Sequence, residues 1–362
     1  MRAKKVVIIG AGAAGMAAAI RASQNGAQVT VIEHMDEPLK KLLITGNGRC
    51  NFSNTDISAK HYHGGTAVIE SVIGSCSCDD LLDFMDSINV EALEVHYRFD
   101  ENGYFYPSTN RAETVRGALL SKASELGAEI LTDTSVCAIR KQSGGFIIDT
   151  VSSGKQKSLS ADSIVFATGS NAAPKTGSDS SIYPVIRSLS IPFRTFMPAL
   201  CGIKSDSPEL RMLAGLRADC EAILSDITAN EEYKADVGEI QFNEHTVSGL
   251  PAMQLSRYVP IGKKDGHGMK LFIKLLKANN RDFKLPLEEV ILNVTGTEGF
   301  QKAVCCSGGI PCEVINPETL MYKDIPGIYF AGELIDVDGD CGGYNLHFAF
   351  ASGLKAGSFA SL

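Results

Sequence analysis

Apolar residues at the start of the chain form two short continuous runs with a helical segment between them. The first run, Lys5–Ile9, ends at a glycine, and the second, Gln28–Ile32, ends at Glu33. Runs of this kind are typical of parallel strands that are buried on both faces. The intervening segment Ala13–Asn25 is rich in alanine, and Gly26 follows where a glycine commonly ends a helix. The pattern predicts a β-α-β unit.

Further along, the pattern predicts a second helix, an antiparallel meander and another buried strand. Arg111–Leu126 has a helical pattern that Gly127 stops, and Ala128–Thr132 follows as a strand. Three short segments with Ser-Gly turns between them predict the meander: Ser135–Lys141, Phe146–Val151 and Lys155–Ser160. The apolar run Ile164–Ala167 then predicts another buried strand.

The stretch from about Pro192 to Asn293 has a different character. It contains short β-like runs and a lysine-rich segment, Lys263–Lys284, before the strand Ile328–Ala331 and the closing helix Leu346–Ala360. We therefore expect an α/β fold with a Rossmann-type, two-dinucleotide-binding-like domain and an inserted mainly-β domain. The expected boundaries are residues 1–190 with the meander for the first part, 191–293 for the inserted substrate domain, and 294–362 for the second part.

Composition limits the possible classes of protein. The chain has 362 residues and a net charge of −8, which argues against nucleic acid as the main partner because phosphate binding needs a basic surface. The ten cysteines form no CxxC pair, which disfavours a zinc ribbon and favours reduced thiols in a cytoplasmic protein. The basic start before an apolar run also fits a signal peptide, but the glycine spacing fits a strand, turn and helix better. No other run is long enough to span a membrane.

The turn after the first strand has the GxGxxG spacing of a dinucleotide-binding loop, formed by Gly10, Ala11, Gly12, Ala13, Ala14 and Gly15. The first glycine allows the turn, the second lets backbone N–H groups approach a diphosphate, and the third lets the helix pack against the strand. The diphosphate would lie at the amino end of the helix, which favours anions. Glu33 would bind the ribose hydroxyls and disfavours a 2′-phosphate. The pattern therefore predicts FAD or NAD, and not NADP.

Two later turns favour FAD over NAD. They contain the candidate contacts Ala167, Thr168, Gly169, Gly332, Glu333, Gly343, Tyr344 and Asn345. In flavoproteins with two dinucleotide-type folds, a strand that ends in an Ala-Thr-Gly turn lies near the cofactor. Glu333 would bind the ribityl chain. The amino end of the last helix would face the O2 edge of the flavin and stabilise its anionic reduced form.

The loop from Thr45 to Asn51 has its own candidate chemistry. Gly46 and Gly48 let the backbone bend around a flat ring, while Asn47, Arg49 and Asn51 offer donors to the flavin pyrimidine edge or to phosphates. The alternative is a polar surface loop without a ligand.

The segment Lys40–Asn51, KKLLITGNGRCN, resembles a segment of the BaiN-like or aminoacetone-oxidase-like family of bacterial NAD(P)/FAD-dependent oxidoreductases. Other matching stretches follow in order across nearly the whole chain: Phe105–Pro107, Gly238–Gly249, Ser307–Ile310 and Gly332–Asn345. The resemblance implies one tightly held FAD, a split Rossmann-type domain and an inserted β-rich domain. It implies no single substrate, because members reduce enone-type steroid acids, oxidise amines or are unassigned. The remaining candidate cofactor residues are His34, Lys41, Cys50, Val136 and Leu346.

No catalytic residue stands out from the sequence. His245 and His347 are weak candidates for a proton donor beside the flavin, against structural roles, and His347 stands where the family usually has Gln. His61 and His63 lack further nearby ligands, so we expect no metal. Cys50 has no partner at the spacing of a redox dithiol, which disfavours a disulfide reductase.

Three functions remain open. The leading one is an oxidoreductase that passes hydride from NAD(P)H through flavin N5 to a small organic acceptor. The second is an oxidase that acts on an amine-type substrate with oxygen as acceptor, and the third is a non-catalytic flavin-binding redox sensor. Because there is only one GxGxxG, a nicotinamide donor would enter the substrate site transiently. We expect a small-molecule substrate, with neither nucleic acid nor a membrane as partner.

Overall fold

The computed structural model describes residues 2–97, 100–227, 229–259, 268–279 and 288–362. The chain forms two compact units. The first contains the residues up to Ser170, Pro174–Thr195 and Gly308–Leu362, and the second contains Asn171–Ala173 and Phe196–Ser307. The expected boundary at residue 293 is wrong, because it falls inside strand β19 (Glu289–Thr297), which belongs to the sheet of the second unit.

A five-stranded parallel sheet forms the centre of the first unit, in the order β21-β11-β1-β2-β7. Its strands are β1 (Lys5–Ile9), β2 (Gln28–Ile32), β7 (Glu129–Leu131), β11 (Ser163–Phe166) and β21 (Ile328–Phe330). The central strands are almost completely buried, which explains their continuous apolar sequences. The C-terminal segment therefore completes a sheet that the N-terminal segment begins.

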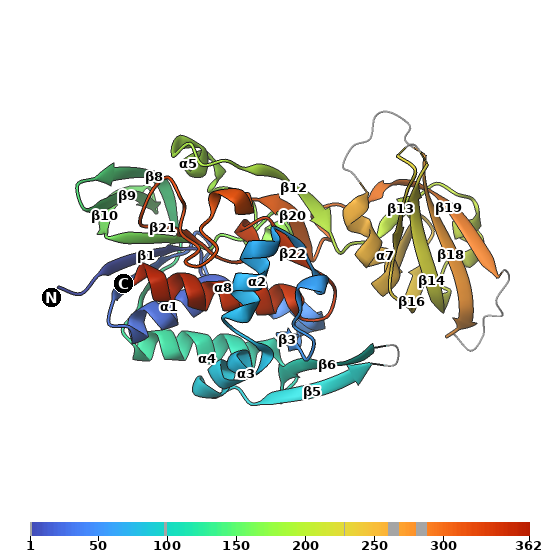
Figure 1. Cartoon of the computed structure of the whole chain (residues 1–362), viewed down its shortest axis with the longest axis horizontal. Helices are drawn as coiled ribbons and strands as arrows, with labels where there is room; N and C mark the ends of the chain where they lie inside the picture. Colours follow the sequence, from blue (N-terminus) through green and yellow to red (C-terminus); the bar gives the residue numbers. More distant parts are fainter. Residues whose placement is uncertain (1, 98–99, 228, 260–267, 280–287) are drawn as a thin grey trace. The chain divides into compact units, whose positions relative to one another are not determined.

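Helices and a meander cover this sheet. The helices α1 (Ala13–Gln24) and α8 (Tyr344–Ala360) pack on each other and contact the strands, and α4 (Ala112–Glu125) packs beside α1 (Figure 1). The meander also contacts the sheet, and its strands are β8 (Thr134–Gln142), β9 (Gly145–Ser152) and β10 (Lys155–Ala161). The sheet thus lies between a helical layer and a β layer.

Short elements surround the amino end of α8. They are η1 (Leu42–Gly48), β3 (Ser53–Asn54), η2 (Ala59–His61), β4 (Tyr62–Gly64), α2 (Thr66–Gly74), α3 (Cys78–Ser87), β5 (Ala92–Tyr97), β6 (Asp100–Pro107) and β22 (Val337–Gly339). Strand β22 pairs antiparallel with β4, and β3 pairs with β6. The first of these pairings brings residues 62–64 next to residues 337–339, although most of the chain separates them in sequence.

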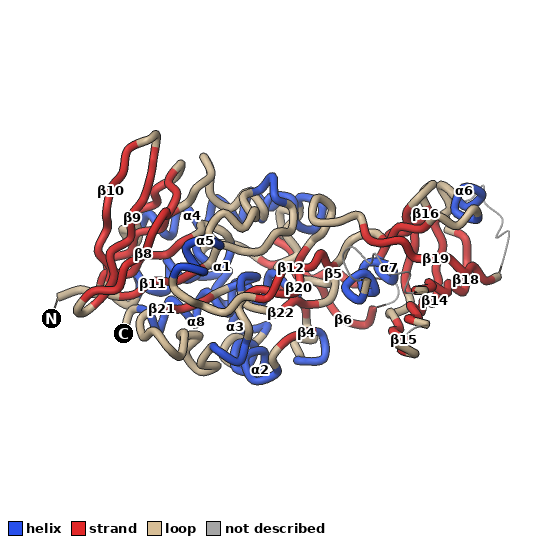
Figure 2. Tube along the Cα trace, turned by 90° about the horizontal axis from the view of Figure 1, so that it is seen from above, coloured by secondary structure: helices blue, strands red, loops and turns tan. Residues whose placement is uncertain are grey.

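The second unit is built mainly of strands (Figure 2). Its seven-stranded sheet has the order β15-β14-β16-β17-β13-β19-β18, and β14 also pairs with β18. Besides β19, the strands of this sheet are β13 (Ile203–Ser205), β14 (Arg217–Asp226), β15 (Glu231–Lys234), β16 (Gly238–Phe242), β17 (Thr246–Gly249) and β18 (Met269–Ala278). The unit also contains the helices α6 (Glu209–Leu213) and α7 (Leu250–Leu255). Alternating residues of these strands form its apolar core.

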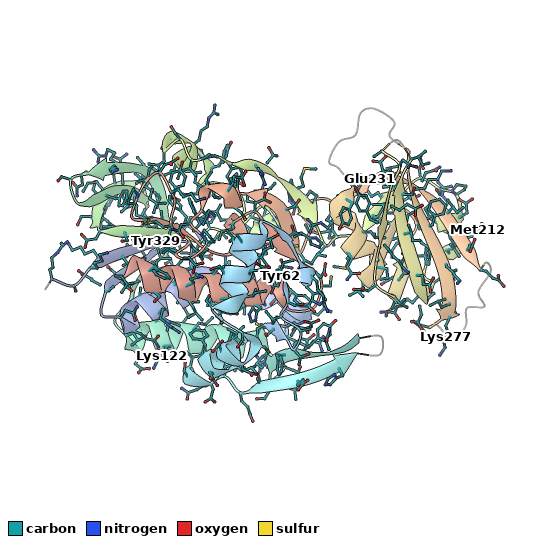
Figure 3. All side chains as sticks on the ribbon, in the orientation of Figure 1. Tyr62, Lys122, Met212, Glu231, Lys277 and Tyr329 are labelled. Atoms are coloured by element: carbon teal, nitrogen blue, oxygen red, sulfur yellow. The ribbon has the colours of Figure 1, made fainter. Side chains whose placement is uncertain are left out.

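The connections between the units contain α5 (Tyr183–Ser188), β12 (Arg194–Ala199) and β20 (Cys305–Gly309), of which β12 and β20 pair with each other. Figure 3 shows Tyr62 and Tyr329 among the packed side chains of the first unit, and Met212 and Lys277 on the second. The ends of the predicted lysine-rich segment, residues 263–267 and 280–284, lie outside the described residues. In the described part of the chain, no helix combines the length and apolar character that a membrane span requires.

Candidate functional site

The loop between β1 and α1 presents the amino end of a helix to open space. Gly12 is the N-cap of α1, has an extended backbone and receives no side-chain cap. A Cβ atom added at Gly12 would meet nothing within 4 Å, whereas one at Gly15 would lie 1.9 Å from the carbonyl oxygen of Gly10. The N–H groups of a first helical turn have no partners within the helix and favour anions. The loop therefore has both the space and the donors that a phosphate group needs.

A buried carboxylate lies beside this loop, at the end of β2. Glu33 accepts hydrogen bonds from the backbone N–H groups of Ala11 at 2.8 Å and Met35 at 2.9 Å. Its Oε1 lies 3.1 Å from Nδ1 of His34. Burial raises the pKa of Glu33, but the hydrogen bonds with His34, Met35 and Ala11 outweigh it, so the pKa is lowered. Glu33 is thus ionised at the place where an acid can bind ribose hydroxyls.

The amino end of α8 is held by a side chain from another part of the chain. Gly343, its N-cap, has a φ of 95°, and a Cβ atom there would lie 2.5 Å from the carbonyl oxygen of Ser53. The N–H group of Gly343 donates to the amide oxygen of Asn51 at 3.2 Å, and the Asn51 amide nitrogen donates to the carbonyls of Phe105 and Ser53. No side chain caps the first turn of α8. The N-cap of α8 is therefore fixed in position, and the positive end of a helix favours an anionic group.

Two polar side chains follow strands of the parallel sheet at its carboxyl edge. Lys41 Nζ lies 2.5 Å from Oε2 of Glu333, which follows β21. Among the described residues, Oε1 of Glu333 and Oγ1 of Thr168, just after β11, are buried without a hydrogen-bond partner. Other buried polar atoms of the described residues also lack a partner, and a bound ligand is one explanation for such an atom. Both atoms lie at the edge where open α/β sheets bind ligands.

The η1 loop has the bent backbone that its glycines predicted. Gly46 and Asn47 both have left-handed conformations. The Arg49 guanidinium lies 4.6 Å from the ring centroid of Tyr106, and its Nε donates to the Gly46 carbonyl at 3.1 Å. Arg49 is therefore held against an aromatic ring at the base of its own loop.

Several predicted cofactor residues have structural roles in this unit. The side chains of Ala11 and Cys50 have no exposed surface, so their predicted contacts with the cofactor would have to come from their backbone groups. Burial raises the pKa of the Cys50 thiol to about 12, although a hydrogen bond with Thr45 opposes this. The Asn345 amide pairs with the N–H and carbonyl groups of Gly339 and fixes the turn before α8.

The predicted proton donors lie in different units. His347 is completely buried, with Nδ1 2.9 Å from Ser53 Oγ and Nε2 2.9 Å from the Cys76 carbonyl oxygen. Burial lowers the pKa of His347 to about 4. A neutral imidazole without exposed surface cannot reach a substrate, so this candidate is wrong and His347 joins α8 to its neighbours. His245 lies exposed between β16 and β17 of the second unit and remains a prediction.

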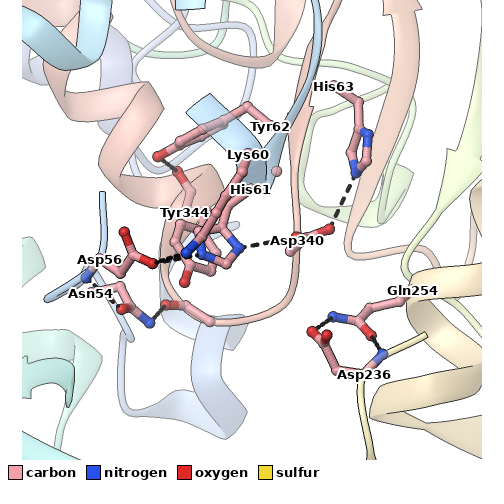
Figure 4. A network of polar contacts seen from close by, with 12 residues as sticks. Asn54, Asp56, Lys60, His61, Tyr62, His63, Asp236, Gln254, Asp340 and Tyr344 are labelled. Carbon is pink, nitrogen blue, oxygen red and sulfur yellow. Dashed lines mark hydrogen bonds and ion pairs between the residues drawn. The ribbon is translucent and has the colours of Figure 1, made fainter. Parts of the chain in front are cut away.

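A polar network that the sequence did not predict lies next to the start of α8 (Figure 4). His61 Nδ1 is 3.2 Å from Oδ2 of Asp340, and His61 Nε2 is 3.2 Å from Oδ2 of Asp56. His63 Nε2 is 3.2 Å from the other oxygen of Asp340. In the described part of the chain, no group of three or more His, Cys, Asp or Glu side chains is arranged to hold a metal. Asp56 lies five residues before His61, whereas the pairing of β4 with β22 brings the distant Asp340 next to His61 and His63. No local pattern indicates this pairing.

A family model described as the HI0933-like protein Rossmann domain matches residues 4–359. The chain belongs to this family. Among curated relatives, the 3-dehydro-bile acid delta(4,6)-reductase of Clostridium scindens is 29% identical over 99% of each chain. The ribosomal RNA dihydrouridine synthase of Escherichia coli is 24% identical over 96% of this chain and 95% of its own.

Solved structures share the fold at lower identity. The 3-ketosteroid-delta4-(5alpha)-dehydrogenase from Rhodococcus jostii RHA1, solved with 4-androstene-3,17-dione, is 15% identical with a TM-score of 0.57, covering 99% of this chain and 97% of its own. Mycobacterium smegmatis Sdh1 is 16% identical with a TM-score of 0.58, covering 99% and 68%. The HI0933-like chain is therefore an FAD-dependent oxidoreductase with a Rossmann-type FAD-binding domain.

The residues of the first unit fit FAD. The open space at Gly12 and the Glu33 carboxylate suit the diphosphate and adenosine ribose. The buried oxygens of Thr168 and Glu333 without partners suit the hydroxyl groups of the cofactor. The open amino end of α8 suits the electron-accepting edge of an isoalloxazine.

Proposed function

We propose that this protein takes hydride from NAD(P)H and passes it through FAD to an organic acceptor whose carbon–carbon double bond is conjugated to a carbonyl group. The names of two relatives support this class of acceptor. A delta(4,6)-reductase that acts on a 3-dehydro bile acid saturates a double bond in conjugation with the 3-oxo group. A dihydrouridine synthase saturates the uracil double bond next to a carbonyl. The two reactions share the same chemical step on very different molecules.

The observation that carries the proposal is the fixed, uncapped amino end of α8. FAD supplies hydride transfer when it is bound. A positive helix end stabilises negative charge placed near it, and this favours the reduced form of a flavin and hence electron uptake from NAD(P)H. Glu33 and the Gly12 loop would hold the adenosine half, while Glu333 and Thr168 would hold the polar chain between the two halves.

The net charge of −8 favours a small acceptor over a polynucleotide. The relative from Escherichia coli is nevertheless named for ribosomal RNA, which makes uridine in RNA a second acceptor to test. A small acceptor with a 3-oxo-4-ene group and uridine within RNA share the conjugated double bond, so both belong in the same experiment.

The test is an anaerobic spectrum of the purified holoprotein. NADH or NADPH should bleach the visible flavin band, and an acceptor with a conjugated double bond should restore it while forming the saturated product. The acceptors are 4-androstene-3,17-dione, free uridine and unmodified ribosomal RNA. Bleaching by an amine with recovery only in oxygen would establish the oxidase instead. If neither NADH nor NADPH bleaches the flavin band, the result would contradict the proposal and favour the redox sensor.

A further inference from the structure

The His61 network contacts the first residue of α8 directly. The His61 ring stacks on the ring of Tyr344, with centroids 4.4 Å apart and planes 19° apart. The N–H group of Asp340 donates to the carbonyl of His61 at 2.9 Å, so backbone and side chains both join these segments. Tyr62, next along β4, donates through its hydroxyl to the carbonyl of Tyr344 at 3.2 Å. Movement of His61 would therefore be transmitted to the start of α8.

Contacts from several side chains hold the turn between β22 and α8. Asp340 and Gly343 lie at its two ends, and the described contacts that hold it are those of His61, His63, Asn51, Asn54 and Asn345. Asn51, Asn54 and Asn345 are neutral amides, and their contacts do not change with pH. The imidazole of His61, by contrast, is titratable, and it bridges the carboxylates of Asp56 and Asp340.

We propose that His61, Asp56 and Asp340 form a protonation-dependent clamp that positions the amino end of α8 for FAD. In the protonated form, each ring nitrogen of His61 donates to a carboxylate, and both ion pairs hold the turn. In the neutral form, one ring nitrogen of His61 carries no proton. The lone pair of that nitrogen then faces a carboxylate oxygen, and this hydrogen bond is lost. His61 is a positioning residue, because it acts on the cofactor through Tyr344 and the turn.

The surrounding charges favour the protonated form. Burial lowers the pKa of His61, but its hydrogen bonds to Asp340 and Asp56 and their negative charges outweigh this, so the pKa is raised above its ordinary value. Lys60 contacts Asp56 and lowers the pKa of that carboxyl to about 2. Burial raises the pKa of Asp340, but His61 and His63 together lower it. Burial raises the pKa values of the nearby Tyr62 hydroxyl and Cys341 thiol, which stay neutral at physiological pH. The Tyr344 phenol ring stacks on His61, and Asp338 of β22 lies opposite His63 in the strand pairing.

The sign of the pH dependence follows from the raised pKa. The clamp is fully formed below the ordinary histidine pKa of about 6.5 and is lost as the pH rises through the raised value. FAD binding requires α8 in position, so the affinity for FAD should fall over the same range. We expect a decrease of about tenfold, which is the loss of one charge-assisted hydrogen bond at a partly exposed site.

The test is the Kd of FAD for the full-length apoprotein, measured by quenching of FAD fluorescence across this pH range. His61→Gln should bind FAD about tenfold more weakly at low pH and lose the pH dependence. The matched control is His63→Gln, which removes the outer contact with Asp340 but leaves both contacts of His61, and it should keep the pH dependence. Far-UV circular dichroism and thermal unfolding of each apoprotein identify variants that do not fold.

The wild-type profile tests the proposal even if His61→Gln does not fold, because it needs no substitution. A wild-type Kd that stays constant as the pH rises would overturn the clamp. An unchanged pH dependence in His61→Gln would overturn the assignment to His61. Neither result depends on the acceptor or on NAD(P)H, so failure of the clamp can be distinguished from failure of the proposed function.

Discussion

The amino ends of α1 and α8 are the two positions in the first unit where we propose that the cofactor binds, and they are built in different ways. Six consecutive residues, Gly10–Gly15, form the first one, together with Glu33 from the next strand. The second depends on Asn51, His61 and Asp340, which come from distant parts of the chain. A site formed by consecutive residues can be recognised from its sequence, whereas one assembled by strand pairing cannot.

The largest effect expected in this comparison comes from two glycines of the α1 loop. Gly12→Val should leave the apoprotein folded, since the backbone there is extended and the space is open. It should weaken FAD binding more than about a hundredfold, because the side chain occupies the space for the diphosphate. Gly15→Val should instead prevent folding, since its Cβ would lie 1.9 Å from the Gly10 carbonyl oxygen.

Thermal unfolding of the apoproteins and FAD fluorescence titration measure these two outcomes separately. A yellow, fully loaded Gly12→Val protein would contradict the placement of the diphosphate. A stable Gly15→Val protein would contradict the close packing of α1 against its loop.

The second prediction concerns the buried histidine of α8. Because the pKa of His347 is lowered to about 4, its contribution to stability is complete above its ordinary pKa and is lost as the pH falls towards 4. This loss should reach about 3 kcal/mol in the free energy of unfolding. His347→Gln, which cannot titrate, should remove that part of the pH dependence, as urea unfolding between pH values of about 7 and 4 would show.

The matched control is His96→Gln, because the His96 side chain is 60% exposed. This variant should keep the wild-type pH dependence. Equal acid sensitivity in the wild type and in His347→Gln would show that His347 is not held in its neutral form.

The third prediction tests the α1 side through Glu33. The two carboxylate oxygens of Glu33 accept hydrogen bonds from the N–H groups of Ala11 and Met35. In Glu33→Gln only one oxygen remains, and the amide NH2 group faces one of these N–H donors. We expect FAD binding to weaken by about tenfold, which fluorescence titration measures. Glu37→Gln, at an exposed position two residues after Met35, should bind FAD like the wild type. Unchanged FAD binding by Glu33→Gln would exclude a role for this carboxylate.

The smallest expected effect tests how α8 is anchored. Asn51→Ala leaves the Gly343 N–H group and two carbonyls without their partner, which should lower the free energy of unfolding by about 1 to 2 kcal/mol. Gln24→Ala, at the exposed end of α1, should change it by less than about 0.5 kcal/mol. Urea unfolding of the two apoproteins would measure the difference, and equal stabilities would show that Asn51 does not hold α8.

The sequence predicted the elements whose signals are local. The apolar runs Lys5–Ile9 and Gln28–Ile32 are the strands β1 and β2, and the three meander segments match β8, β9 and β10 closely. The closing helix begins at Tyr344, two residues before the prediction, because Gly343 and Asn51 fix its start and Asn51 lies far away in sequence. The boundary at residue 293 was wrong since nothing local distinguishes an inserted strand from a returning one.

For the site, the sequence predicted the residue types better than their roles. Glu33 and Glu333 lie at the ends of their strands, where their spacing and the family resemblance placed them. His347 was wrong as a candidate proton donor, because its burial depends on packing that the residue type does not reveal. The His61 network was missed because its carboxylate partner lies 279 residues away. The network could not be predicted because its residues are brought together by pairing between distant segments of the chain.

The most direct test of the whole account is the cofactor released from the purified wild-type protein, identified by its spectrum and mass. The account predicts a yellow protein that releases stoichiometric FAD on denaturation. Colourless protein that also fails to bind added FAD would contradict it, because the open ends of both α1 and α8 would then have no flavin to bind.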